Sequence, residues 1–206
     1  MKEVSTDELL YGYIHGVFPM AEKDGTLYWY SPDPRAIIPI ENYKISRSLR
    51  PVINQKVFDV RINQNFEAVI RHCAAPRKYE TETWISEELI RSYTELHRLG
   101  YAHSIECYQN DQLVGGLYGV AIGAAFFGES MFHLVSNASK VAFHYLISIL
   151  SKENFRLLDT QFINHNVLRF GAIEIPREEY LKKLRRAVTA RAHFRMQEPV
   201  GSNPIG

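Results

Sequence analysis

The stretch AHSIECYQNDQLVGGLYGVAIGAAFFGESMF, residues 102–132, decides the fold because it contains three strand-like runs in succession. Residues 102–108 and 113–120 are the first two runs. Asn110-Asp111 joins them, and this dipeptide tolerates the positive φ angles of tight hairpin turns. The sequence therefore predicts a β-hairpin at the centre of the chain.

The third run, residues 124–132, carries a carboxylate where an apolar strand is expected. Glu129 lies in the tripeptide GES, between two pairs of apolar side chains. A charge inside a buried strand needs a partner or a function, because burying it alone is costly. Glu129 is therefore a candidate functional residue.

A helix and a fourth strand follow these three runs. Ser136 or Asn137 can cap the helix, whose apolar side chains recur at helical spacing on one face. The next strand, residues 155–161, presents Asp159 and Gln161 two positions apart, and hence on the same side of the sheet. We predict one mixed sheet in which Glu129, Asp159 and Gln161 share the wall of a cleft.

The length, net charge and cysteine content of the chain limit the class of protein it can be. The chain of 206 residues is long enough for one domain, or for one domain with a small appendage. Its net charge of +1 excludes a protein whose whole surface attracts polyanions, so any nucleic-acid contact must be local. Two distant cysteines, the lack of a signal-peptide pattern and the lack of a long apolar run predict a cytoplasmic protein without a membrane span.

The flanking segments add helices and two candidate binding features. A capping box opens a short helix at residues 5–16, and helical stripes follow at 66–73 and 86–100. The segment 37–61 is rich in basic side chains, of which Arg47, Arg50 and Lys56 are candidates for contact with nucleic-acid phosphates. An ordinary solvated surface explains the same charges equally well.

Several mechanisms are excluded by missing motifs. The sequence contains no dinucleotide fingerprint, no P-loop and no nucleophile elbow, and its eight histidines lack the spacing of metal ligands. The order of strands and helix in residues 102–161 fits an N-acetyltransferase-type fold. Coenzyme A is disfavoured, because the pyrophosphate loop would have to begin at Gln112, and Leu117 then stands where Gly or Ala is required.

The chain resembles the leucyl/phenylalanyl-tRNA protein transferases over nearly its whole length, through the segments HSIE, LVGGLYGVAIG, FFGESMF, NASK, LLDTQ, GA-x-EIPR, TWI and YWYSPDPR. The resemblance implies an α+β fold with a small N-terminal domain, here residues 1–36, and an N-acetyltransferase-like catalytic domain, here residues 37–206. It also implies transfer of leucine or phenylalanine from aminoacyl-tRNA to the N-terminal amine of a protein, which marks that protein for degradation through the N-degron pathway. No metal or other cofactor is expected.

The same resemblance assigns roles to individual residues. Asp159 would hold Gln161, which orients the attacking amine, and Glu129 and Trp84 would bind the aminoacyl-adenosine end of the tRNA. Phe126 would line the pocket for the donor side chain together with four leucines, although ordinary core packing explains those leucines as well: Leu117, Leu146, Leu150 and Leu158. Asn164 belongs to the acceptor side of the site.

Two departures from the family pattern bear on the substrates. Met20 stands where relatives often have an aromatic residue that stacks on the terminal adenine, so Tyr13, Phe18 or Trp29 would supply the ring. After the LLDTQ strand, the histidine of the family motif is displaced to position 165, and Arg169 replaces a serine. We therefore expect Arg or Lys acceptors by family, or Asp and Glu acceptors if Arg169 faces the acceptor. Two alternatives stay open: a small-molecule N-acyltransferase using coenzyme A, and a non-catalytic module that binds the tRNA 3′ end.

Overall fold

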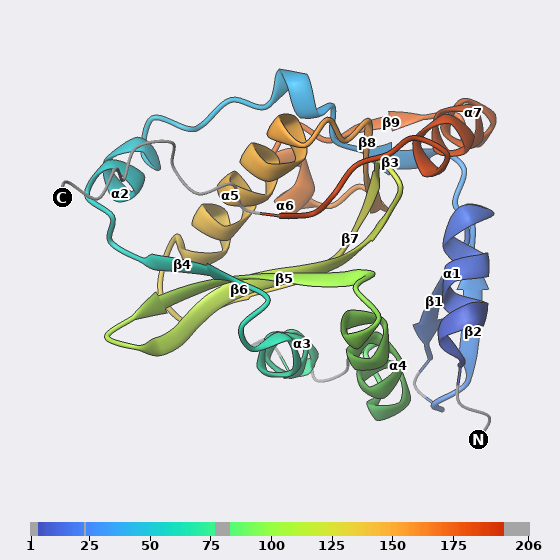
Figure 1. Ribbon diagram of the computed structural model, residues 1–206, viewed down its shortest axis with the longest axis horizontal. Coiled ribbons are helices and arrows are strands. Elements are labelled where there is room, and N and C mark those ends of the chain that lie inside the picture. Colours follow the sequence, from blue (N-terminus) through green and yellow to red (C-terminus); the bar gives the residue numbers. More distant parts are fainter. Residues whose placement is uncertain (1–3, 23, 77–82, 196–206) are drawn as a thin grey trace, which may run out of the picture.

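A seven-stranded mixed sheet organises the computed structural model, which describes residues 4–22, 24–76 and 83–195. Its strand order is β4-β5-β6-β7-β8-β3-β9, and a separate two-stranded sheet pairs β1 with β2 (Figure 1). The elements are α1 Thr6–Ile14, β1 Phe18–Ala21, β2 Leu27–Tyr30, β3 Arg35–Ile37, η1 Ile40–Asn42, α2 Arg50–Asn54, β4 Asp59–Ile62, α3 Phe66–Ala74, α4 Glu87–Arg98, β5 Ala102–Gln109, β6 Gln112–Ile122, β7 Ala125–His133, α5 Ala138–Lys152, β8 Leu157–Gln161, α6 His165–Leu168, β9 Ile173–Ile175 and α7 Arg177–Val188.

The predicted hairpin is confirmed at the centre of the sheet. β5 and β6 pair in antiparallel fashion, with Gln109 opposite Gln112 at the turn. Asn110 and Asp111 have φ angles of 51° and 57°, the left-handed conformation that a two-residue hairpin turn requires. The dipeptide therefore fixes the register of β5 against β6 at the turn.

A β-bulge interrupts the pairing of β6 with β7 at Glu129. Tyr118 lies opposite Ser130, while the next residue, Gly119, lies opposite Gly128, so Glu129 is the extra residue on β7. A bulge leaves its extra residue unpaired and changes the direction of its side chain. The GES tripeptide thus interrupts the apolar run for a structural reason.

β7 and β8 run parallel and then separate. Their pairing covers residues 125–127 against 157–159, and it ends just before the bulge. Helix α5 makes the crossover between the two strands, and β8 pairs along its other edge with β3. The sheet therefore opens between β7 and β8, which confirms the predicted α+β, N-acetyltransferase-like class.

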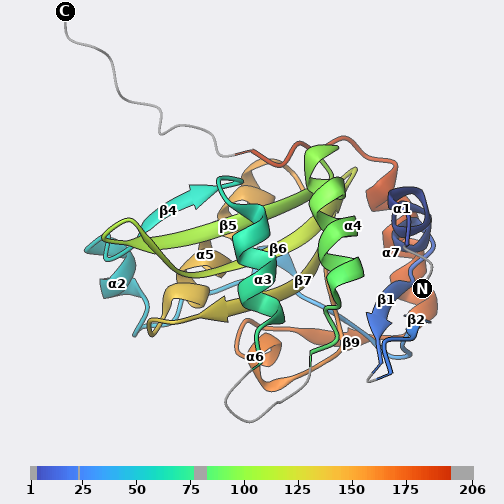
Figure 2. The same cartoon turned by 90° about the horizontal axis from the view of Figure 1, so that it is seen from below.

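Helices cover both faces of the sheet. Figure 1 shows α5 on one face and α3 with α4 on the other, and Figure 2 shows α3 and α4 side by side across the strands. Each face has its own apolar core, and the core under α3 and α4 also contains side chains of α1 and α7. In the described part of the chain, no helix has both the length and the apolar character needed to cross a membrane.

The helix ends largely follow the predicted signals. Ser5 and Glu8 form the capping box of α1, and Ser86 caps α4. Asn137 is the N-cap of α5, but through a left-handed backbone conformation without a side-chain hydrogen bond. The predicted division of the chain between residues 36 and 37 falls inside β3, and it stays a prediction.

Candidate active site

A cavity of about 270 Å³ lies where β7 and β8 separate. Both strands contribute to its lining, together with β6, α5, α6 and the segments around Met20 and Trp84. The lining residues are Met20, Trp84, Leu117, Tyr118, Gly128, Glu129, Ser130, Met131, Phe143, Leu146, Leu158, Thr160, Gln161, Phe162, Asn164, Asn166 and Val167. The sheet topology thus creates the opening, and side chains from both separated strands face it.

Glu129 accepts hydrogen bonds from three side chains. The Tyr13 hydroxyl donates to Oε1 at 2.7 Å, the Gln161 amide Nε2 donates to Oε1 at 3.0 Å, and the Tyr93 hydroxyl donates to Oε2 at 3.4 Å. The Tyr13 and Tyr93 hydroxyls also contact each other. The carboxylate released by the bulge is therefore held from α1, α4 and β8 at once.

The environment of Glu129 brings its ionisation close to neutral pH. Burial raises the pKa of Glu129 to about 7, and the nearby charge of Asp159 acts in the same direction. Hydrogen bonds from Tyr13, Gln161 and Tyr93 oppose this rise because they stabilise the carboxylate. Burial, with Glu129 nearby, also raises the pKa of both tyrosines, which consequently remain neutral donors. Both charge states of Glu129 are thus accessible near pH 7.

Gln161 faces the cavity in a conformation that two contacts fix. Its φ angle is 66°, a left-handed value that is uncommon for a residue with a side chain. Its backbone N–H donates to Asp159 Oδ1 at 2.8 Å, and its side-chain Nε2 donates to Glu129. The side-chain carbonyl accepts no hydrogen bond from any described residue. That oxygen is therefore available to a ligand.

Asp159 lies behind Gln161, which corrects the expectation that its carboxylate faces the cleft. The side chain is fully buried and is absent from the cavity wall. Arg35 donates to it twice, at 2.9 and 2.6 Å, and the Tyr180 hydroxyl donates to it at 2.7 Å. Arg35 also donates to the Gly16 carbonyl at 3.0 Å. Asp159 therefore acts on the cavity only through Gln161.

The apolar wall of the cavity agrees with part of the predicted set. Leu117, Leu146 and Leu158 line it. Phe126 and Leu150 do not, which corrects the expectation for both residues: they are fully buried in the core beside α5, where Phe126 stacks on Phe194 at 5.2 Å. Three further apolar side chains complete the wall, although sequence reasoning missed them: Met131, Phe143 and Val167.

The structure places only some of the aromatic residues that were predicted to contact a base in the cavity wall. Trp84 lines the cavity, as does Phe162, which is 41% exposed and was not predicted. Tyr13 reaches the site only through its bond to Glu129. Phe18 is fully buried with its ring 4.7 Å from the Arg35 guanidinium, so it is not a platform for a ligand.

The remaining predicted residues lie at the rim and on the outer surface. Asn164 lines the cavity, and its side-chain oxygen accepts hydrogen bonds from two backbone N–H groups of α6. Arg47, Arg50 and Lys56 are exposed around α2 and lie outside the cavity wall. Arg169 is exposed at the end of α6 and is likewise absent from the wall.

Comparison with known proteins gives one consistent family. The model of the leucyl/phenylalanyl-tRNA protein transferase family matches residues 37–185, and the model of its N-terminal domain matches residues 2–33. Among solved structures, L-PGS from Bacillus licheniformis is similar at a TM-score of 0.47 and 8% identity, covering 92% of this chain and 94% of its own.

Several leucyl/phenylalanyl-tRNA protein transferases are similar to this chain over nearly their full lengths. The one from Prosthecochloris aestuarii is 50% identical over 188 residues, which are 91% of this chain and 97% of the relative. Those from Maricaulis maris and Gloeobacter violaceus are also 50% identical, over 94% and 91% of this chain and over 91% and 95% of their own lengths. The chain therefore belongs to the leucyl/phenylalanyl-tRNA protein transferase family.

Proposed function

We propose that this protein transfers leucine or phenylalanine from an aminoacyl-tRNA to the N-terminal amine of an acceptor protein, and that the product is marked for degradation. One observation carries the proposal. Gln161, whose side-chain amide is held by Glu129, lines the same cavity as Leu117, Leu146 and Leu158, so the cavity offers a polar group to a reacting ester and an apolar surface to a hydrophobic side chain.

The donor occupies the cavity with its side chain against the apolar wall. Leu117, Leu146 and Leu158 give a surface suited to a branched or aromatic group, and they offer nothing to a polar one. Trp84 and Phe162 provide rings for the terminal adenosine, because an aromatic face stacks on any base. Glu129 lines the same cavity and can accept a hydrogen bond from the ribose or from the donor amine.

The reaction needs alignment more than a strong base, because an aminoacyl ester is already activated. The neutral acceptor amine attacks the ester carbonyl carbon and forms the new C–N bond. The C–O bond then breaks, the terminal ribose hydroxyl of the tRNA leaves with a proton, and the amine loses one. The free side-chain oxygen of Gln161 accepts an N–H of the attacking amine and directs its lone pair at the carbonyl. A neutral amide cannot itself retain the proton at neutral pH.

Arg35 and Asp159 act as positioning residues in this scheme. Their buried ion pair holds the carboxylate that accepts the Gln161 backbone N–H, so the left-handed conformation of Gln161 is maintained from behind. Glu129 fixes the amide from the opposite side. If either contact were lost, the Gln161 side chain would no longer point at the attacking amine. The rate would then fall, because the reaction depends on alignment.

Labelled leucine transfer tests the proposed function. The protein is incubated with Leu-tRNA or Phe-tRNA and with peptides that begin with Arg, Lys, Asp or Glu, and each peptide has an N-acetylated control. We expect label on the free peptides and none on the blocked ones. Acetyl transfer from acetyl-coenzyme A would favour the N-acyltransferase. Binding of tRNA without transfer to any peptide would favour the binding module.

The acceptor series includes both charge classes for a structural reason. Arg and Lys follow from family membership, whereas the exposed Arg169 at the end of α6 would favour Asp or Glu. Transfer to Arg and Lys peptides that equals or exceeds transfer to Asp and Glu peptides removes the acidic preference and leaves the transferase assignment intact.

A further inference from the structure

A second and larger groove adjoins the cavity. It has a volume of about 780 Å³ and shares Met131 and Asn166 with the cavity wall, so the two spaces meet at these residues. The groove lies between α5, α6, the end of α3 and the segment before α2. Its lining residues are Tyr43, Lys44, Ser46, Ser48, Leu49, His72, Ala75, Pro76, Met131, Phe132, His133, Leu134, Ser136, Asn137, Ser139, Lys140, Asn166, Arg169 and Phe170.

Three cationic side chains from separate parts of the chain converge on the groove. Lys44 comes from the segment between η1 and α2, Lys140 from the first turn of α5, and Arg169 from the end of α6. Within the described lining there is no Asp or Glu. The groove is therefore a local basic surface on a protein of nearly neutral net charge.

These cations are not neutralised by the described part of the protein. None of the three forms an ion pair with a described carboxylate, whereas Lys182 on α7 pairs with Glu178 at 2.7 Å. Among the described residues, Lys140 donates only to the Asn137 side chain, at 3.1 Å. It also lies at the positive end of the α5 dipole, in a first turn that has no acidic residue. Positive charges that cluster without paired carboxylates favour the binding of an anionic ligand.

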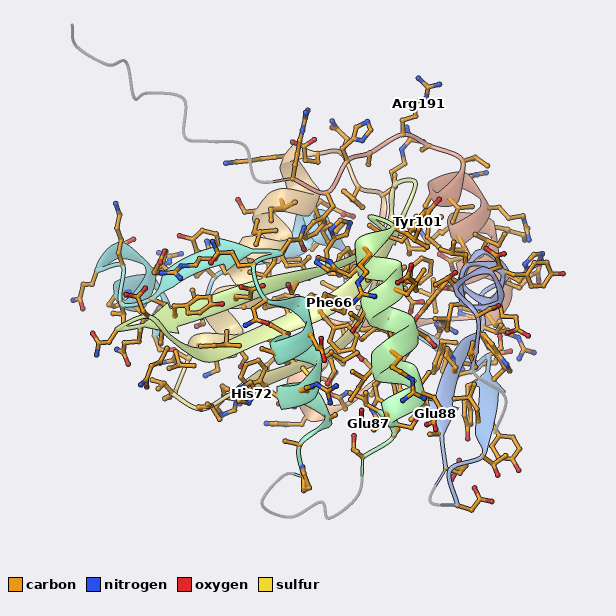
Figure 3. All side chains as sticks on the ribbon, turned by 60° about the horizontal axis from the view of Figure 1, so that its bottom comes forward. Phe66, His72, Glu87, Glu88, Tyr101 and Arg191 are labelled. Atoms are coloured by element: carbon orange, nitrogen blue, oxygen red, sulfur yellow. The ribbon has the colours of Figure 1, made fainter. Side chains whose placement is uncertain are left out.

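Flat side chains accompany the charges. His72, near the C-terminal end of α3 in Figure 3, stacks on Phe132 with ring centres 4.6 Å apart. Phe170 stacks on Phe143 at 3.8 Å, which joins a ring of the groove to a ring of the cavity. A cationic groove with aromatic faces is the usual combination for single-stranded nucleic acid, since phosphates meet the cations and bases stack on the rings.

We infer that this groove holds the unpaired nucleotides that precede the aminoacylated adenosine of the donor tRNA. The inference rests on the proposed function. If the ester lies in the cavity, the polynucleotide that carries it must leave through an opening, and the groove provides a basic path from the cavity. Its lining also includes Ser46 and Ser48, on either side of the exposed Arg47.

Three donors of increasing length test this inference. Leucyl-adenosine has no phosphate, leucyl-CCA trinucleotide adds the unpaired nucleotides, and leucyl-tRNA adds the rest. The variants are Lys44→Met and Lys140→Met, with Lys152→Met at the opposite, exposed end of α5 as the matched control. Thermal melts establish that each variant is folded.

We expect each groove variant to leave kcat/KM for leucyl-adenosine within about twofold of the wild type. For the trinucleotide and for tRNA, kcat/KM falls roughly three- to tenfold, as for the loss of one exposed phosphate contact. The slope of log affinity for non-acylated CCA against log salt becomes shallower by about 0.7 per lost contact. Lys152→Met changes none of these quantities.

Two results would overturn the inference. If the variants raise the peptide KM with leucyl-adenosine as donor, the groove holds the acceptor instead. If they change neither transfer from any donor nor binding of CCA, the groove is not used. Binding of non-acylated CCA is measured directly, so it decides the inference even if the protein transfers no leucine, the result that would refute the proposed function itself.

Discussion

Replacing Glu129 with glutamine should make the protein more stable at pH 8 and leave its stability nearly unchanged at pH 4.5. Burial raises the pKa of Glu129 from an ordinary 4.5 to about 7, so the folded protein keeps this proton to a higher pH than the unfolded chain does. Between these values the folded state binds more protons, and stability therefore falls as the pH rises. The amide side chain of the Glu129→Gln variant does not titrate, so this loss disappears.

The magnitude follows from the same linkage. At 1.36 kcal/mol for each pH unit, the interval from 4.5 to about 7 corresponds to roughly 3 kcal/mol at most. Water in the open cavity screens the charge, so the measured difference should be somewhat smaller. The amide can keep the main contacts, because its oxygen still accepts from Tyr13 and from Gln161.

Urea denaturation of both proteins between pH 4.5 and pH 8.5 is the assay. The histidines are common to wild type and variant, so their titration cancels in the difference between the two unfolding free energies. Glu174→Gln, at an exposed position on β9, reports any general effect of removing a carboxylate. A difference that stays constant across this pH range would refute the account of Glu129. A variant whose unfolding free energy falls relative to that of the wild type as the pH rises would refute it too.

Four further changes test other parts of the site. Arg35→Leu leaves the Asp159 carboxylate buried without its ion-pair partner and should lower the unfolding free energy by about 3 to 5 kcal/mol. The double variant Arg35→Leu/Asp159→Asn should recover part of this loss, and urea titration at pH 7 checks both variants. Gln161→Gly removes the side-chain amide that orients the amine, but glycine suits the left-handed backbone. Single-turnover transfer should therefore fall about 100-fold while the melting temperature changes little; normal transfer would exclude Gln161 from catalysis. Gly119→Ala brings a methyl group against the Phe127 carbonyl at the bulge and should destabilise by about 1 to 3 kcal/mol, which a thermal melt would reveal. Leu146→Ala enlarges the cavity at its apolar wall and should raise kcat/KM for the phenylalanyl donor relative to the leucyl donor by about tenfold. An unchanged ratio of the two values would place the donor side chain elsewhere.

The central elements could be predicted because their signals are local. Asn110-Asp111 determined the hairpin, and the interrupted run around Glu129 marked the position that the structure reveals as a bulge. The apolar stripe from Val141 to Leu150 predicted the crossover helix. Each of these features depends on neighbours within a few residues, which a single sequence displays directly.

The buried network could not be predicted in the same way. Arg35 meets Asp159 across 124 positions of the chain, and no local pattern links them. The rule that alternate strand residues face one side also failed to describe the site, because Gln161 has a left-handed backbone and Asp159 is turned toward Arg35. Phe126 was misplaced because an apolar strand residue gives no sign of which core receives it.

The structure of this protein bound to an unreactive amide analogue of leucyl-adenosine tests the account most directly. We expect the leucine side chain against Leu117, Leu146 and Leu158, the adenine beside Trp84 or Phe162, and the Gln161 oxygen within hydrogen-bonding reach of the space next to the carbonyl carbon. An analogue bound outside the cavity between β7 and β8, or bound there with its carbonyl remote from Gln161, would contradict it.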